Sequence, residues 1–114
     1  AYDHKLVDLA DSIAKEKNIE VQHGVYMGVQ GPTFETPAEY RMYHKMGGDA
    51  VGMSTVPEVI VARHSGIKVF GISVITDLGG FDVPVKVSHE EVQEAANAAQ
   101  PRMTEIMREM IKRS

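Results

Sequence analysis

Three helix-start signatures, separated by short apolar runs, most constrain how this chain can fold. Each signature has Ser or Thr at the N-cap and Glu three residues later, a capping box in which each side chain bonds the other residue's backbone N–H. The signatures occupy residues 36–39, 55–58 and 88–91. Residues 49–53 and 68–75 are short, mainly apolar runs in which Val, Ile and Phe do not alternate strictly with polar residues, which is typical of parallel strands covered on both faces. This order predicts an α/β fold with helical crossovers between strands.

The remaining elements follow from similar patterns. Glycines suited to the left-handed conformation should end two of the helices, before Gly47 and before Gly66. Pro101 should kink the last helix, whose apolar stripe should face the core. Residues 78–87, with Gly79, Gly80 and Pro84, should form a mobile loop. The predicted order is a helix at 2–16, a strand at 21–29, a helix from 36, a strand at 49–53, a helix from 55, a strand at 68–75 and a helix at 88–112.

Composition excludes several classes of function. The chain of 114 residues has no Cys, so disulfides, a Cys nucleophile and Cys-ligated metal centres are absent. A net charge of -4 argues against nucleic acid and anionic lipid as partners. The five His residues show no ligand spacing, so we expect no metal site. No apolar run is long enough to span a bilayer and no export signal is visible, which favours the cytoplasm.

The residues that could bind a ligand or take part in a reaction lie mainly in three segments. Ligands of parallel α/β sheets bind beyond the carboxyl ends of the strands. Three segments of this chain, 30–36, 53–55 and 76–81, follow predicted strands. They contain most of the carboxylates, hydroxyls and aromatic rings that a ligand site would use. The pattern therefore predicts a site at this edge of the sheet.

Each candidate residue also has a purely structural interpretation. Glu35 could accept a ligand N–H beside the flat wall of Phe34, or be a solvated loop residue beside a core aromatic. Ser54 could bind an anion at a helix N-terminus, or only cap that helix. Asp77 could bond a ligand, or end a strand and begin a turn. His89 could contact a ligand hydroxyl, or be an exposed first-turn residue. Residue type alone leaves both interpretations open.

Four segments together resemble one family. The sequences GPTFET (31–36), GDAVGMSTVPE (48–58), ITD (75–77) and HEEV (89–92) resemble the trimeric class of purine nucleoside phosphorylases. The resemblance covers the whole chain, but only the C-terminal part of that family's subunit, somewhat under half. It implies a nucleoside phosphorylase-like mixed sheet flanked by helices, here a partial domain formed by residues 1–114. It also implies phosphate-dependent cleavage of purine ribonucleosides to free base and ribose 1-phosphate.

The resemblance also assigns roles to individual residues. Glu35 resembles the glutamate that accepts from purine N1–H, and with Asp77 it takes the catalytic positions. Inorganic phosphate is then a co-substrate, and no metal or organic cofactor is required. The implied contacts are Phe34, Glu35, Thr76 and Asp77 with the base, Tyr26, Met53 and His89 with the ribose, and Ser54 with phosphate.

Asp77 departs from the family pattern. The 6-oxopurine-specific members usually have Asn at this position, beside purine N7. An Asn side chain donates and accepts, whereas an ionised Asp only accepts, unless its neighbours keep it protonated. An acceptor suits an exocyclic 6-amino group, as in the related methylthioadenosine phosphorylases. We therefore hypothesise that Asp77 broadens the specificity toward 6-aminopurines.

A second departure concerns phosphate. The family's main phosphate-binding segments, a Gly-Ser loop and later an Arg and a His, lie N-terminal to anything in this chain. The resemblance thus predicts a fragment that is inactive, or nearly so, by itself. It should associate with itself or with the missing N-terminal half, in a parent that forms a trimer. The alternatives are a methylthioadenosine phosphorylase-like enzyme and a non-catalytic nucleoside-binding or assembly module.

Overall fold

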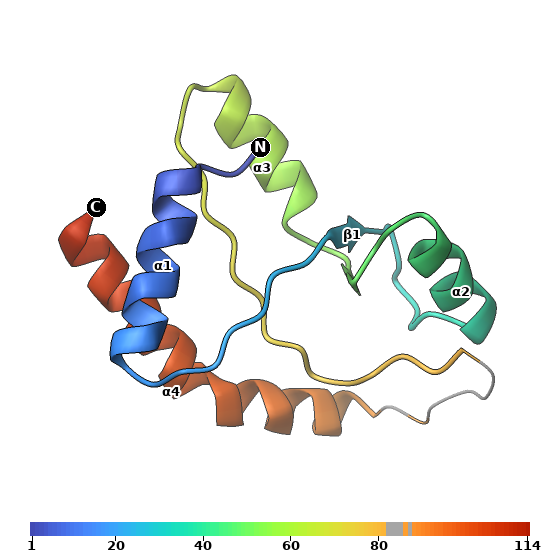
Figure 1. The fold of residues 1–114 in the computed structure, drawn as a ribbon. Coiled ribbons are helices and arrows are strands. Elements are labelled where there is room, and N and C mark those ends of the chain that lie inside the picture. Colours follow the sequence, from blue (N-terminus) through green and yellow to red (C-terminus); the bar gives the residue numbers. More distant parts are fainter. Residues whose placement is uncertain (82–85, 87) are drawn as a thin grey trace.

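The computed structural model describes residues 1–81, 86 and 88–114. The described part contains two short strands, which pair in parallel, and four helices (Figure 1). This arrangement confirms the predicted α/β class as a small mixed α/β fragment. The elements are α1 (His4–Glu16), β1 (Tyr26–Gly28), α2 (Pro37–Lys45), β2 (Ala50–Gly52), α3 (Val56–His64) and α4 (His89–Arg113).

Two of the three predicted capping boxes are present. At the start of α2, the Glu39 N–H donates to Thr36 Oγ1 (3.2 Å) and the Thr36 N–H donates to Glu39 Oε2 (2.6 Å). Ser88 and Glu91 form the same pair at the start of α4, at 3.1 and 3.0 Å. Asp3 caps α1, which therefore begins at His4 rather than at residue 2. These helix starts are local, so the sequence predicts them well.

The predicted capping box at Thr55 is wrong. Thr55 has φ 73° and ψ -57°, and its side chain makes no cap hydrogen bond. The N–H of Val56 instead donates to the carbonyl of Ser54 at 2.8 Å. These values describe a γ-turn of the rare, strained kind, centred on a β-branched residue. Because an N-cap residue needs extended backbone, this turn prevents Thr55 from capping α3.

The predicted strands are shorter or absent. β1 and β2 pair only over Tyr26↔Ala50, Met27↔Val51 and Gly28↔Gly52, so the strands predicted at 21–29 and 49–53 are reduced to their centres. Residues 68–75 form no strand. A strand needs a hydrogen-bonded neighbour, and none lies along this segment within the described part of the chain. It crosses the molecule as extended backbone instead (Figure 1), bonded to Asp3 through the Val69 carbonyl at 2.8 Å.

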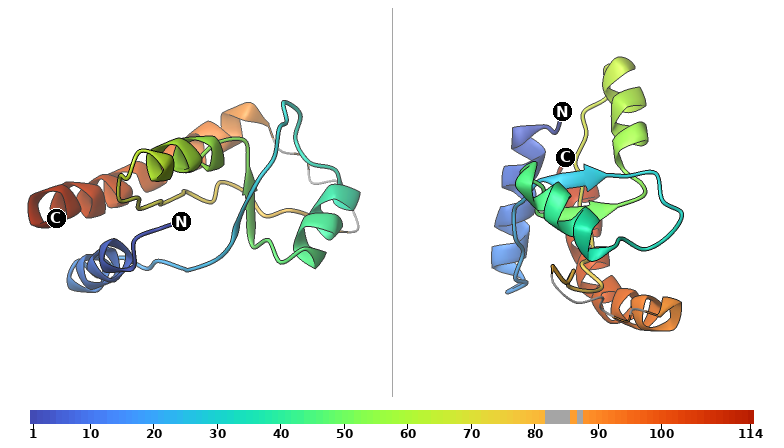
Figure 2. Two further views of the ribbon diagram at one scale, coloured as in Figure 1. Left: turned by 90° about the horizontal axis from the view of Figure 1, so that it is seen from above. Right: turned by 90° about the vertical axis from the view of Figure 1, so that its right-hand side faces the viewer.

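The core lies between α1 and α4. Its fully buried side chains, Ile13 and Ile106, come from the two helices, and Phe70 and Ile72 of the extended segment pack against this cluster. Figure 2 shows α2 at the end of the molecule opposite α1, with the strands between the two helices. The cluster consists of Ala10, Ile13, Ala14, Ile106 and Met110.

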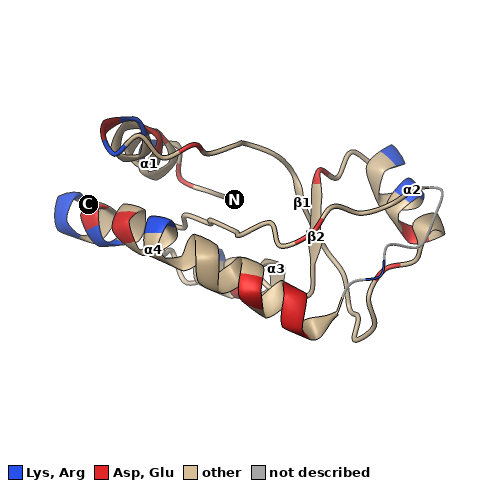
Figure 3. Ribbon diagram, turned by 90° about the horizontal axis from the view of Figure 1, so that it is seen from below, with Lys and Arg blue, Asp and Glu red and all other residues tan. Residues whose placement is uncertain are grey.

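Helix α4 is long and carries opposite charges at its ends. It continues through Pro101 and changes direction along its length (Figure 1). Its first turn is acidic and its last turn is basic (Figure 3), which complements the helix dipole. Arg113 binds both carboxylate oxygens of Glu16, at 3.2 and 2.9 Å, and so ties the end of α4 to α1. Of the helices described, none is long and apolar enough to cross a membrane.

Gly47 and Gly66 have φ values of 94° and 77°, as predicted for residues that follow a helix end. Part of the loop predicted at 78–87, namely residues 82–85 and 87, lies outside the described residues. Residues 78–81 pack beside α2, as described below.

Removing side-chain volume from the α1–α4 core should destabilise the chain. Ile106 is 1% exposed, so Ile106→Ala should lower the free energy of unfolding by about 2–5 kcal/mol. Ile111 on the same helix is 73% exposed, and Ile111→Ala should change it by less than about 0.5 kcal/mol. Urea denaturation of both variants checks this. Equal losses would contradict the assignment of the core to this face of α4.

Candidate functional site

The segments that follow β1 and β2 meet at one edge of the sheet. The strands are parallel, so their carboxyl ends lie together. Gly31 has φ 64°, and an added Cβ at this position would overlap the sulfur of Met53. No other residue type fits that contact without displacement. The expected meeting of residues 30–36 with 53–55 is therefore present.

A hydroxyl cluster follows β2. The Ser54 N–H donates to the hydroxyl oxygen of Tyr26 at 3.3 Å, and the Ser54 Oγ lies 3.4 Å from that oxygen. Thr55 Oγ1 lies 3.1 Å from Ser54 Oγ. Ser54 is exposed and directly precedes the γ-turn that leads into α3. Hydroxyl donors at a helix N-terminus suit an anion.

A second cluster joins Glu35 to the end of the extended segment. The Tyr40 hydroxyl donates to Glu35 Oε2 at 3.4 Å, and the Thr76 hydroxyl donates to Asp77 Oδ1 at 2.8 Å. Burial raises the pKa of the Tyr40 phenol to about 12, and the negative charges of Glu35 and Asp77 add to this effect. Glu35, Tyr40 and Asp77 are all half-buried. The two carboxylates thus lie near one phenol.

Helix α2 holds the segment that follows Asp77. An added Cβ at Gly79 would lie 2.7 Å from the Tyr40 ring, so ring and backbone are in close contact. Arg41 Nη1 donates to the Phe81 carbonyl. The His44 and Phe81 rings pack with centroids 5.3 Å apart. Since Glu35 immediately precedes the N-cap of α2, the same helix positions both carboxylate segments.

The structure brings most of the predicted site residues into these two clusters. Tyr26, Met53 and Ser54 surround the strand ends, and Glu35, Thr76 and Asp77 lie near Tyr40. Phe34 is 52% exposed and Met53 is 44% exposed, so both present apolar surface outward. His89 is the exposed first residue of α4. The His89 side chain makes no hydrogen bond or ion pair with any other described residue.

Sequence reasoning missed Tyr40. Side chains of a helix lean toward its N-terminus, so a residue of the first turns covers the preceding loop. Tyr40 is the fourth residue of α2 and lies five residues after Glu35. The capping box at Thr36 fixes where α2 begins, and this geometry could have identified Tyr40 as a neighbour of Glu35.

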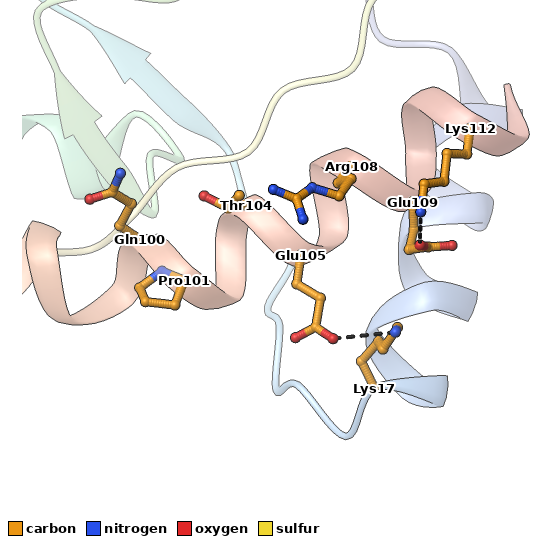
Figure 4. Close-up of a pocket in the computed structure, with 8 residues that line it drawn as sticks. All are labelled: Lys17, Gln100, Pro101, Thr104, Glu105, Arg108, Glu109 and Lys112. Atoms are coloured by element: carbon orange, nitrogen blue, oxygen red, sulfur yellow. Dashed lines mark hydrogen bonds and ion pairs between the residues drawn. The ribbon is translucent and has the colours of Figure 1, made fainter.

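A cavity of about 540 Å³ lies elsewhere, between the end of α1 and α4 (Figure 4). Ion pairs of Lys17 with Glu105 (3.3 Å) and of Lys112 with Glu109 (3.1 Å) cross its lining. Its lining contains no aromatic side chain and none of the predicted site residues. Ligand pockets are usually apolar with a few polar groups. We therefore assign the candidate site to the strand ends.

Comparison with known proteins identifies the family. The family model described as Phosphorylase superfamily matches residues 1–112. The chain belongs to this superfamily. It is 55% identical over 94 residues to purine nucleoside phosphorylase 1 of Bacillus subtilis (strain 168), which covers 82% of this chain and 35% of that protein.

Solved structures agree with this family membership. The Schistosoma mansoni purine nucleoside phosphorylase in complex with inosine superimposes with a TM-score of 0.93 at 42% identity, covering 99% of this chain and 41% of that one. The same enzyme in complex with adenosine gives a TM-score of 0.92 at 41% identity, over 96% of this chain and 41% of that one. These matches confirm the predicted nucleoside phosphorylase fold. The chain spans well under half the length of these superfamily members.

Replacing Thr55 should relieve backbone strain. A positive φ at a β-branched residue costs about 1–3 kcal/mol, whereas Gly adopts it freely but loses about 1 kcal/mol in chain entropy. Thr55→Gly should therefore leave the chain as stable or more stable, by up to about 2 kcal/mol. Thr36→Gly is the matched control: Thr36 precedes another nine-residue helix at φ -79° and makes its cap hydrogen bond.

Thr36→Gly should destabilise the chain by up to about 1 kcal/mol. Urea denaturation measures both variants. A loss of stability in Thr55→Gly as large as that in Thr36→Gly would show that the γ-turn stores no strain.

Proposed function

We propose that this chain is the nucleoside-binding, C-terminal portion of a purine nucleoside phosphorylase. The reaction transfers the ribose of a purine ribonucleoside to inorganic phosphate, giving free base and ribose 1-phosphate. The observation that carries the proposal is the arrangement of Glu35 and Asp77 around Tyr40, beside the strand ends, in a chain 55% identical to the Bacillus subtilis phosphorylase.

The two clusters suit the two ends of a nucleoside. Glu35 accepts from a base N–H, Phe34 provides a flat wall for the ring, and Thr76 and Asp77 contact the same base. Tyr26, Met53 and His89 contact the ribose. Ser54 donates to phosphate. The exposure of Phe34 and Met53 supports these roles, since both side chains are open to a ligand.

The chemistry explains why carboxylates face the base. Cleavage of the N-glycosidic bond leaves positive charge on the ribose and negative charge on the departing purine. A hydrogen bond that strengthens as the charge moves accelerates the reaction, because it is stronger in the transition state than in the ground state. Glu35, which accepts from the base N–H, and Asp77 are the groups to which we assign this effect. Phosphate stabilises the ribose cation and attacks it, so neither metal nor organic cofactor is needed.

The proposal requires a second polypeptide segment. Ser54 is the only phosphate contact that we assign to this chain. Val25, Ile67 and Ile75, on the extended segments, are 55%, 57% and 60% exposed. Exposed apolar side chains at such positions favour association with another part of a protein. We infer that the remaining part of the enzyme covers these segments and supplies the other phosphate ligands, within a cytoplasmic, trimeric enzyme of purine salvage.

Two alternatives make different predictions. A methylthioadenosine phosphorylase would prefer 5′-methylthioadenosine, but the relatives reported above are named purine nucleoside phosphorylases, which disfavours it. A non-catalytic nucleoside-binding or assembly module would bind purines without turning them over, even when the missing part is supplied.

Reconstitution tests the proposed function. The 114-residue chain should release no base from inosine in phosphate buffer. Mixed or co-expressed with the N-terminal part of the Bacillus subtilis enzyme, it should release base in proportion to phosphate. Inosine, adenosine and 5′-methylthioadenosine are compared, with Glu35→Gln as the inactive control for inosine. Turnover by the chain alone would contradict the assignment of the phosphate site, and binding without turnover by the complex would favour the non-catalytic module.

Asp77 should shift substrate preference in the reconstituted enzyme. Its Oδ1 already accepts from Thr76, and an ionised carboxylate accepts the 6-amino hydrogens of adenosine with its other oxygen. Asp77→Asn should therefore raise the ratio of kcat/KM for inosine over adenosine, by about tenfold if one charged hydrogen bond is exchanged. Asp8→Asn, at an exposed position on α1, is the matched control. An unchanged ratio in Asp77→Asn would refute this role.

A further inference from the structure

Glu35 has two carboxylate oxygens, and the structure distinguishes them. The Tyr40 hydroxyl contacts Oε2 at 3.4 Å, and no described residue donates to Oε1. The distance is long for an O–H···O bond, which usually spans about 2.5–3.0 Å, so the contact orients the carboxylate more than it stabilises it. One oxygen is thus engaged by the protein and the other remains for a ligand.

The Tyr40 hydroxyl is a donor at neutral pH. Burial, the charges of Glu35 and Asp77, the hydrogen bond to Glu35 and the charge of Glu39 together raise its pKa to about 12. The phenol therefore keeps its proton in every physiological condition. A protonated phenol beside a carboxylate has one arrangement that satisfies both groups, in which the phenol donates.

The Tyr40 ring is held on its other side. The backbone of Gly79 leaves no room for a Cβ, which would lie 2.7 Å from Tyr40 Cε1. Arg41 and His44 of the same helix hold Phe81, two residues further along. Tyr40 thus lies between Glu35 and the backbone just beyond Asp77, and any shift of its ring moves the hydroxyl relative to Glu35.

We propose that Tyr40 is a positioning residue: its hydroxyl holds Oε2 of Glu35 and its ring rests on Gly79, so that Oε1 faces the N–H of a purine base. The inference rests on the proposed function, because it assigns Glu35 to base recognition. It adds a specificity-determining element, since a fixed acceptor favours bases that carry a proton at N1. Inosine has this proton, whereas adenosine has a lone pair at N1.

The first experiment tests the contact in the 114-residue chain without any substrate. The ¹³C NMR signal of the Glu35 carboxyl carbon at neutral pH reports its hydrogen bonding. Tyr40→Phe should shift this signal while leaving the ring on Gly79. Gly79→Ala should shift it too, because the added methyl displaces the ring. Tyr43→Phe is the matched control, a phenol on the same helix whose hydroxyl makes no hydrogen bond among the described residues. An unmoved Glu35 signal in both test variants overturns the proposal.

The second experiment tests the consequence in the reconstituted enzyme. Tyr40→Phe should lower kcat/KM for inosine about five- to tenfold and leave that for adenosine within about twofold, since only inosine donates to Oε1. Gly79→Ala should lower the inosine-to-adenosine ratio in the same direction, and Tyr43→Phe should leave it unchanged. Equal losses for both substrates would mean that Tyr40 only supports the fold, which overturns the proposed role.

The two experiments test separate claims, so the proposed function and the role of Tyr40 can be refuted independently. A wild-type complex that never releases base refutes the proposed function, and the NMR comparison still decides whether Tyr40 holds Glu35. An active wild-type complex with an unchanged substrate ratio in Tyr40→Phe refutes the role of Tyr40 alone.

Discussion

The parallel pairing of β1 with β2 is the constraint on which the candidate site depends. The pairing is short, but Asp49 strengthens its start: its carboxylate accepts from the Val25 N–H at 2.8 Å, and its own N–H donates to the Val25 carbonyl at 2.9 Å. Val29 continues the ladder through the Gly52 carbonyl at 2.9 Å. Parallel pairing places both strand ends at one edge, and so brings a loop that ends in Glu35 beside the hydroxyls that follow β2.

The hydrophobic core lies in a different part of the molecule. It is formed by α1 and α4, and Val59 is the only buried hydrophobic residue that belongs to α2, α3 or the two strands as the structure describes them. The site is held instead by hydrogen bonds, by close backbone contacts and by the contacts of α2 with residues 79–81. Few buried contacts stabilise such a site, and a further part of the proposed enzyme that covers the extended segments would give the site the rigidity that catalysis requires.

How well the sequence predicts a feature depends on how far apart along the chain the interacting residues lie. The capping boxes at Thr36 and Ser88 act within four residues, so their patterns give the starts of α2 and α4 correctly. The strand expected at 68–75 needs a neighbour that the described chain does not supply, and composition cannot reveal that. Thr55 has the capping pattern, yet the γ-turn overrides it. For Glu35, residue type alone favoured a solvated loop residue, and only the resemblance carried by the GPTFET motif indicated a ligand contact.

The two phenols at the site act in opposite senses, and this matches the charge separation of the proposed reaction. Tyr26 accepts from the Ser54 backbone and lies within reach of its Oγ, so the Ser54 hydroxyl is steadied where a donor to an anion is wanted. Tyr40 donates to Glu35, which steadies an acceptor where a base N–H is wanted. Each phenol hydrogen-bonds one neighbouring residue, Ser54 or Glu35, and leaves that residue a further polar group for a ligand. In the proposed reaction, the base of a nucleoside would meet an acceptor at Glu35, and the co-substrate phosphate would meet a donor at Ser54.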